Sequence, residues 1–394
     1  MSRLPFQAFD ADNHYYEAED AFIRHMPKPL QKRAVQWAEV NGRKRLLVAG
    51  RIDRFIPNPT FDPVTKPGAL DAFFRGKNPG GLEPAQLFGQ LEPIQPAYRD
   101  RDARVKLLDE QGLEAAILFP TQGVGIEQPL RRSAEITHAA LHAFNRWLDE
   151  DWGFAYQGRL YTVPMISLMD PAKAVEELEW CLERGAHMVH VRAAPVPAEG
   201  RSRSLGDASH DPFWARAARA GVSVAFHAAD HGYGKYAADW GESKPMEAFR
   251  ANAFGMVTQA GRAIFDAMAA LVIHGVFARH PNLRVYSVEN GADWVPLLLA
   301  RLKKAYGQTP KAFHEDPLTT FRRHVWVSPY YEDDIRGLTD LIGPERVVFG
   351  SDFPHAEGLA DPLSFVDELP GFSDAEILAI MRDNGRELVR LRPA

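Results

Sequence analysis

The chain of 394 residues contains little cysteine and no excess of basic charge, and both shortages limit what it can be. Its single cysteine, Cys181, excludes an intrachain disulfide and a cysteine-rich zinc site. The formal net charge of -6 gives no basic surface of the kind that neutralises phosphates, so we expect no nucleic-acid partner. A small-molecule substrate fits this composition better.

Long hydrophobic runs are also missing. The first residues lack the apolar stretch of a signal peptide, and the apolar run at 297–300 is far too short to span a bilayer. We therefore expect a cytoplasmic protein without a membrane partner. With 45% hydrophobic and 25% charged residues, the chain has the composition of a globular protein that buries a large core.

What the sequence does contain is an alternation of short apolar runs with segments of helical period, which is typical of β/α units. We therefore predict an α/β protein with a (β/α)8 TIM-type barrel, built as one elaborated domain over residues 1–394. The predicted strands are residues 9–12, 115–119, 161–164, 188–191, 222–226, 284–288, 325–327 and 347–349. The predicted helices include residues 133–149, 171–184, 212–220, 261–280, 333–342 and 373–384.

Two segments interrupt this alternation. Residues 27–98, rich in proline and glycine, follow the first predicted strand, and residues 229–253 follow the fifth. Loops at the carboxyl ends of barrel strands build the active site in this architecture, so both insertions are expected to wall or cap a substrate pocket. A contact with a partner subunit explains them equally well.

Four predicted strand ends carry groups that bind metals. Asp12 and His14 point the same way because strand side chains alternate between faces. His227 ends the fifth predicted strand and Asp352 follows the eighth. Singly, each has an ordinary explanation, such as a turn or helix cap or a packed histidine. Together they predict a site for one divalent ion at the barrel mouth.

Further candidates lie at other strand ends. Glu289 follows the sixth strand, where it either moves a proton or orients a metal ligand. Arg192 and His190 share a face of the fourth strand, and the guanidinium there either clamps a substrate carboxylate or pairs with a neighbouring acid. Tyr330 and His355 are expected to face the substrate.

These positions together resemble the amidohydrolase superfamily. The similarity is greatest to its amidohydrolase-related branch, which contains aminocarboxymuconate-semialdehyde decarboxylase and the γ-resorcylate and 5-carboxyvanillate decarboxylases. The resemblance covers essentially the whole chain outside the first insertion. The segments that carry it are residues 10–14, 226–228, 275–285 and the Phe-Gly-Ser-Asp-Phe-Pro-His run at 349–355.

By this resemblance Asp12 and His14 stand at the family's first-strand ligand pair, His227 at its fifth-strand histidine and Asp352 at its eighth-strand aspartate. No lysine of the kind found in the two-metal branches lies on the fourth strand, so one ion is implied, Zn²⁺ or Mn²⁺. Glu289 departs from the pattern, because decarboxylases of this branch usually have a histidine there.

The resemblance implies a nonoxidative decarboxylase of a small, aromatic or unsaturated hydroxy or oxo acid. In that reaction Asp352 would move a proton and Arg192 would orient the acid. Because Glu289 replaces a histidine, a hydrolase of a lactone, ester or amide stays open. A third alternative is a barrel that binds a ligand without catalysis. The four polar groups at strand ends argue against it, because such a protein has no need of them. The family also implies a homodimer.

Overall fold

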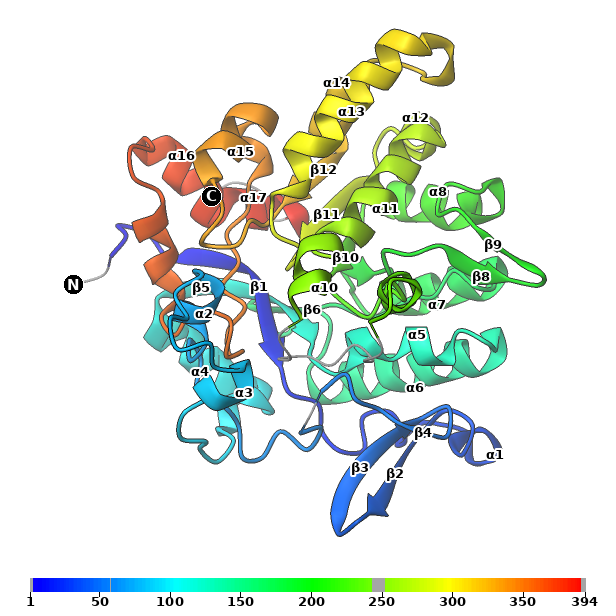
Figure 1. Cartoon of the computed structure of the whole chain (residues 1–394), viewed down its shortest axis with the longest axis vertical. Coiled ribbons are helices and arrows are strands. Elements are labelled where there is room, and N and C mark those ends of the chain that lie inside the picture. Colours follow the sequence, from blue (N-terminus) through cyan, green and yellow to red (C-terminus); the bar gives the residue numbers. More distant parts are fainter. Residues whose placement is uncertain (1–2, 57, 243–251, 391–394) are drawn as a thin grey trace.

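The computed structural model describes residues 3–56, 58–242 and 252–390. Within these residues, seven strands pair in parallel, in the orders β1-β5-β6 and β7-β10-β11-β12 (Figure 1). Each overlaps a predicted strand. Their bounds are β1 (Ala8–Tyr15), β5 (Leu113–Pro120), β6 (Leu160–Thr162), β7 (Met188–His190), β10 (Ser223–His227), β11 (Arg284–Val288) and β12 (Val325–Val327).

Single parallel bridges continue the pairing beyond these two sheets. They join Met165 to His190, Val327 to Val347 and Asn13 to Phe353. The chain after residue 347 therefore lies between β12 and β1. The eighth predicted strand, 347–349, occupies this place, where it forms bridges and not a continuous strand. The chain thus has a mixed α/β fold in which parallel strands are central.

Helices follow the parallel strands along the chain and lie around them in Figure 1. The longer ones are α4 (Arg101–Gln111), α6 (Ala134–Asp151), α7 (Pro171–Glu183), α8 (Asp211–Ala220), α11 (Arg262–Ile273), α13 (Trp294–Gln308), α14 (Pro317–His324) and α15 (Ile335–Ile342). The predicted helix at 261–280 is divided at Gly275, which has a φ of 73° and separates α11 from α12 (Val276–Arg279). The last predicted helix consists of α16 (Asp374–Leu378), a π-helical stretch at Ala379–Asp383 and α17 (Asn384–Leu388).

Short side chains fix where these helices begin and end. Asp100, Ser133 and Asp170 accept hydrogen bonds from backbone amides in the first turns of α4, α6 and α7. Gly112 and Gly221 end α4 and α8 in the left-handed conformation that glycine adopts without strain. α4 and α8 therefore end shortly before the strands β5 and β10 that follow them.

The parallel strands are buried along nearly their whole length. All eight residues of β1 and all five of β10 are buried, as expected where helices cover a parallel sheet. Cys181 is fully buried in the same core and carries no disulfide, as is usual for a free cysteine that packs as a small apolar residue.

An antiparallel hairpin follows β1 and was not predicted. It consists of β2 (Val35–Val40), β3 (Arg43–Val48) and β4 (Arg51–Ile52), and it projects at the bottom of Figure 1. Both of its turns are pairs of left-handed residues, Asn41-Gly42 and Ala49-Gly50. Such two-residue turns match the twist of the strands that they join. The short helices α2 (Asp71–Phe74) and α3 (Pro84–Leu87) complete the segment before α4.

One segment, Ala253–Ile273, is long and apolar enough to cross a membrane by length and composition. It consists of α10 (Ala253–Thr258) and α11, separated by a turn at Gly261 with a φ of 64°. Six residues of α11 are buried in the protein core, whereas α10 has no buried residue. The other part of the second predicted insertion contains α9 (Gly234–Asp239), and residues 243–251 lie outside the described residues.

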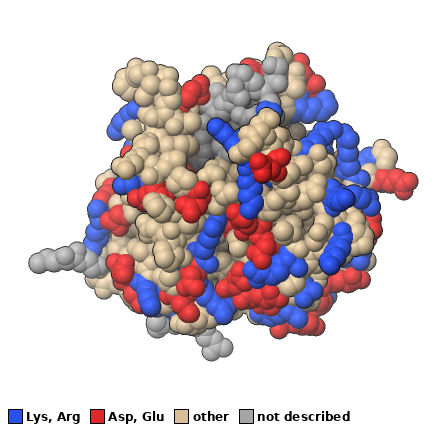
Figure 2. Space-filling model, turned by 90° about the horizontal axis from the view of Figure 1, so that it is seen from below, with Lys and Arg blue, Asp and Glu red and all other residues tan. Residues whose placement is uncertain are grey.

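Charges of both signs are interspersed over the face shown in Figure 2. Exposed ion pairs occur on the surface, for example between Arg24 and Asp151 at 2.6 Å. Such pairs each contribute roughly 0–1 kcal/mol, so they contribute little to the fold. The face has no extended region of one sign that would attract a polyanion.

Candidate functional site

The carboxyl end of β1 brings two predicted ligands together above a third acidic residue. Oδ1 of Asp12 lies 3.4 Å from Nε2 of His14, and both side chains are buried. Asp10, also buried, accepts hydrogen bonds from Nδ2 of Asn13 at 2.8 Å and from the amide of Ser351 at 3.0 Å. Asp10 thereby attaches the end of β1 to the chain that follows Gly350.

Gly350 allows this close approach. A Cβ atom at Gly350 would overlap Cβ of Asp12 and would lie 2.7 Å from Oγ of Ser328. With glycine there, the amides of Ser351 and Asp352 donate to the backbone oxygen of Asp12 at 3.1 and 2.8 Å. These bonds place Asp352 beside Asp12, although the two are 340 positions apart in the sequence.

His227 at the end of β10 is oriented by the backbone. Its Nδ1 lies 2.7 Å from the carbonyl oxygen of Ala228, so the proton belongs on Nδ1, which donates. Nε2 keeps a lone pair and lies 3.3 Å from Nε2 of His14 and 2.9 Å from Oε2 of Glu289. This is the tautomer in which a histidine binds metal through Nε2.

Glu289 and Asp352 both have a left-handed backbone, with φ of 53° and 55°. For residues other than glycine this conformation costs on the order of 1 kcal/mol or more, and such residues cluster at functional sites. Oε2 of Glu289 lies 3.6 Å from Nε2 of His14. Oδ1 of Asp352 lies 3.3 Å from the same nitrogen and 2.7 Å from Nδ1 of His355.

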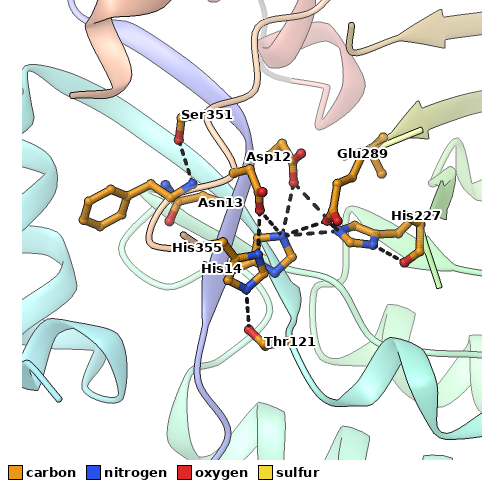
Figure 3. A network of polar contacts seen from close by, with 12 residues as sticks. Asp12, Asn13, His14, Thr121, His227, Glu289, Ser351 and His355 are labelled. Carbon is orange, nitrogen blue, oxygen red and sulfur yellow. Dashed lines mark hydrogen bonds and ion pairs between the residues drawn. The ribbon is translucent and has the colours of Figure 1, made fainter. Parts of the chain in front are cut away.

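These side chains form two overlapping groups of ligand atoms, which Figure 3 shows together. Within each group, the ligand atoms lie within 4.8 Å of one another; the groups are Asp12, His14, His227 and Glu289, and His14, Glu289, Asp352 and His355. Oδ1 of Asp12, Oε2 of Glu289 and Oδ1 of Asp352 are buried and accept no hydrogen bond from the described residues. Buried carboxylate oxygens without partners are costly, and a shared cation removes the cost. The residues therefore fit a divalent metal ion.

Burial and neighbouring charges also shift the pKa values of the residues in this cluster. Burial raises the pKa of the Asp352 carboxyl well above its ordinary value, and the charge of Glu289 adds to the effect. Burial opposes protonation of His14, but Asp12 and Glu289 outweigh it and raise the pKa of His14 to about 9. Burial also favours neutral Glu289, but His227 and His14 outweigh it and lower the pKa of Glu289. The site thus concentrates negative charge that attracts cations.

Of the predicted substrate contacts, His355 is part of this cluster and Tyr330 lies beside it. Nε2 of His355 lies 3.0 Å from Oγ1 of Thr121. The hydroxyl of Tyr330 donates to the backbone oxygen of Glu289 at 2.8 Å and holds the left-handed residue in place. Tyr330 and His355 both line the cavity above the cluster.

Arg192 and His190 lie farther back, at the end of β7. Arg192 is 5% exposed; its Nη1 donates to the side chain of Gln128 and its Nε lies 3.8 Å from Glu127. Neither Arg192 nor His190 is among the described residues that line the cavity. Burial lowers the pKa of His190 well below its ordinary value, so this imidazole is neutral. The structure therefore brings neither residue to the ligand atoms.

The cavity has a volume of about 540 Å³. Its inner end contains His14, His227 and Glu289, and part of its wall comes from the segment between β4 and α4, including Phe61 and Phe88. Residues of the first predicted insertion thus line the cavity. The hairpin β2–β4 contributes no described residue to that lining.

Three lining residues were missed by the sequence reasoning. Thr121 directly follows β5, where the rule that strand ends build the site could have found it. His231 lies in the second predicted insertion, and neither of its buried ring nitrogens has a hydrogen-bond partner among the described residues. Glu357 lies two residues after His355 in a stretch without a recognisable pattern.

Glu17 provides a prediction about pH. It is 3% exposed, accepts bonds from the amides of Gln122 and Gly123, and has a pKa raised to about 7, chiefly by burial. The folded chain thus holds a proton that the unfolded chain loses near pH 4.5. Stability is full below that pH and falls as the pH rises toward 7, by on the order of 3 kcal/mol.

In metal-free protein, urea denaturation of wild type and Glu17→Gln at pH 4, 6 and 8 measures this effect. The difference in unfolding free energy should change in favour of the variant as pH rises. A difference that stays constant with pH would show that Glu17 titrates normally.

A sequence family described as amidohydrolase matches residues 91–391. A solved amidohydrolase from Mycobacterium avium subsp. paratuberculosis K-10 is 48% identical, with a TM-score of 0.93, over 98% of this chain and 100% of that one.

More distant relatives have more specific names. The 2-amino-3-carboxymuconate-6-semialdehyde decarboxylase of Dictyostelium discoideum is 24% identical over 132 residues, 32% of this chain and 36% of that protein. The match thus spans about a third of the curated relative's length. A 2,6-dihydroxybenzoate decarboxylase from Rhizobium is 19% identical (TM-score 0.54), over 78% of this chain and 91% of that one.

A dihydroxybenzoic acid decarboxylase from Polaromonas sp. JS666, solved with manganese and the inhibitor 2-nitroresorcinol, is 18% identical with a TM-score of 0.54. That comparison covers 83% of this chain and 94% of the other. At such identities the Rhizobium and Polaromonas structures show a shared fold alone. The family match covers more than half of the chain, and the solved amidohydrolase matches almost all of it. The chain therefore belongs to the amidohydrolase family.

Proposed function

We propose that the chain is a metal-dependent carboxy-lyase that releases CO₂ from a hydroxy or oxo acid without oxidation. The observation that carries the proposal is the buried cluster in which carboxylate oxygens without hydrogen-bond partners among the described residues converge with the imidazole nitrogens of His14 and His227. The names of the distant relatives, three decarboxylases, support this reaction.

One ion, Mn²⁺ or Zn²⁺, would bind Asp12, His14, His227 and Asp352, with Glu289 as a further ligand. Once bound, it would polarise a substrate oxygen or lower the pKa of a water molecule. Three carboxylates make the site rich in hard oxygen donors, which favours Mn²⁺ somewhat. The manganese in the Polaromonas structure supports this choice.

Asp352 is proposed to carry the proton. Burial raises the pKa of its carboxyl in the metal-free protein, and Nδ1 of His355 lies 2.7 Å from its Oδ1. During the reaction, the bond between the substrate carbon and its carboxylate breaks, CO₂ leaves, and the proton of Asp352 moves to that carbon. Tyr330 and His355 would contact the substrate.

Arg192 and His190 are proposed to orient the acid group indirectly. Both interact electrostatically with His231, which lines the cavity. Since the guanidinium bonds to Gln128, its positive charge would act over a distance and not as a two-pronged clamp.

We also propose that the chain forms a complete barrel. The parallel pairings and bridges would close a single-domain (β/α)8 barrel, with residues 27–98 and 229–253 inserted after strands 1 and 5 and covering its mouth. We further propose a cytoplasmic homodimer that acts on a small molecule, without a nucleic-acid or membrane partner.

A metal-dependent hydrolase is the second candidate, and Glu289 favours it, since a carboxyl at this place can protonate a leaving group. A panel of hydroxybenzoates and aryl lactones, incubated with Mn²⁺-loaded protein, separates the two. CO₂ release supports the lyase, whereas acid production without CO₂ supports the hydrolase. Protein that takes up no Mn²⁺ or Zn²⁺ would instead be a barrel that binds without catalysis.

Glu289→Gln tests the ligand role. Because Oε2 lies within the ligand group, the substitution should lower affinity for Mn²⁺ by about 10- to 100-fold. Metal titration followed by calorimetry measures this, with the exposed Glu150→Gln as the matched control. Turnover that disappears while Mn²⁺ affinity stays unchanged would contradict the ligand role and assign Glu289 to proton transfer.

A further inference from the structure

The cavity above the ligand cluster is lined by polar ligand residues and by many apolar side chains. His14, His227 and Glu289 bring the ligand cluster into its lining. Two walls come from segments far apart in sequence, residues 55–91 and 256–263. Both walls are largely apolar, with Phe73, Phe88 and Met256 among their side chains.

The size of the cavity exceeds what a single-ring acid requires. A cavity of about 150 Å³ accommodates one benzene ring. The volume of about 540 Å³ therefore leaves room for more than one further ring, or an acyl chain of similar size, beyond the group at the cluster.

The described side chains that line the cavity carry charge only on acidic groups and imidazoles. Among the lining residues that the structure describes, none is lysine or arginine, and the charged carboxylic residues are Glu289 and Glu357. Among these described residues, an anionic group placed away from the cluster would find no lysine or arginine to compensate for its lost hydration.

The apolar side chains that line the cavity differ in their exposure to solvent. Phe61 is 5% exposed and stacks on Tyr16 with ring centroids 4.7 Å apart. Phe74 and Met256, by contrast, are 42% and 56% exposed where they line the cavity. Apolar side chains that remain in contact with water at a cavity gain free energy when an apolar ligand covers them.

We propose that the substrate is amphipathic, with one small oxygen-bearing head at the ligand cluster and an uncharged apolar body, of two rings or an equivalent acyl chain, between residues 55–91 and 256–263. This inference rests on the proposed function, because the head is the group that reacts. The cluster and the apolar walls belong to one cavity, so a single molecule contacts both.

A pair of hydroxamates tests the proposal. Benzohydroxamic acid has a metal-binding head and one ring, and 4-phenylbenzohydroxamic acid has the same head with a second ring. Isothermal calorimetry with Mn²⁺-loaded protein should show that the longer compound binds at least about tenfold more tightly.

Ala260→Trp narrows the cavity from an exposed lining position outside the ligand cluster. It should remove the preference for the longer compound and leave the affinity for benzohydroxamic acid unchanged. Leu297→Trp, which adds the same side chain at a 50% exposed position on α13, should keep the preference and serves as the control.

The outcomes separate the two proposals. Equal, metal-dependent binding of both hydroxamates by wild type, or a preference that survives in Ala260→Trp, would overturn the apolar body and leave the metal site intact. Protein that takes up Mn²⁺ poorly and binds neither hydroxamate would remove the proposed function itself, and with it this inference.

Discussion

Replacing His227 with alanine is expected to lower metal affinity by more than about 100-fold and to abolish turnover. Its Nε2 lone pair points at His14 and Glu289, and no other described side chain can supply a nitrogen from β10. A ligand that is lost costs more than an orienting partner, whose removal costs about 10- to 100-fold. Metal content after dialysis against a defined Mn²⁺ concentration measures the effect.

His142→Ala is the matched control, since His142 is 42% exposed and pairs only with Glu177 on the helical surface. It should retain full metal content. Equal Mn²⁺ content in His227→Ala and wild type would remove His227 from the site and would leave the cluster without its best-oriented ligand.

Asp352→Asn is expected to reduce turnover by about 10²- to 10⁴-fold while the protein stays folded and keeps its metal. The amide cannot deliver the proton that we assign to the carboxyl, yet its carbonyl oxygen can still face the ion. Asparagine also tolerates the left-handed backbone at this position, so the change tests chemistry and not conformation.

Single-turnover CO₂ release and metal content together measure this result, with the exposed Asp239→Asn as the control. Turnover within about twofold of wild type would exclude Asp352 as the proton carrier. Loss of the metal together with activity would instead show that the carboxylate charge is needed to hold the ion.

The periodicity of the sequence predicted the central strands well, because buried parallel strands are continuous apolar runs bounded by loops. It did not predict the hairpin β2–β4, whose strands are half exposed and carry charged residues such as Arg43 and Lys44. The pair Asn41-Gly42 was the available signal, since this dipeptide favours the turn that joins the strands.

The candidate site could be predicted where it depends on neighbouring residues of one strand. It could not be predicted where it depends on how closely distant segments of the chain approach each other. Asp12 and His14 follow from strand alternation, and His227 from its place at a strand end. The position of Glu289 among the ligand atoms depends on its left-handed backbone, and the position of Asp352 beside Asp12 depends on Gly350. The apolar cavity depends on loops with no periodic pattern, so only coordinates could reveal it.

The left-handed backbone at positions 289 and 352 restricts how the chemistry of this site can change. Branched side chains such as valine or threonine are strongly disfavoured with such torsions, whereas glycine, asparagine and aspartate accept them. If the codons for residues 289 and 352 are randomised, the folded variants should therefore contain only a few kinds of amino acid at these positions, whichever reaction is selected. Replacement by glycine at either position would relax the local backbone strain and remove the reactive side chain. A single substitution could therefore give a protein that is more stable but inactive.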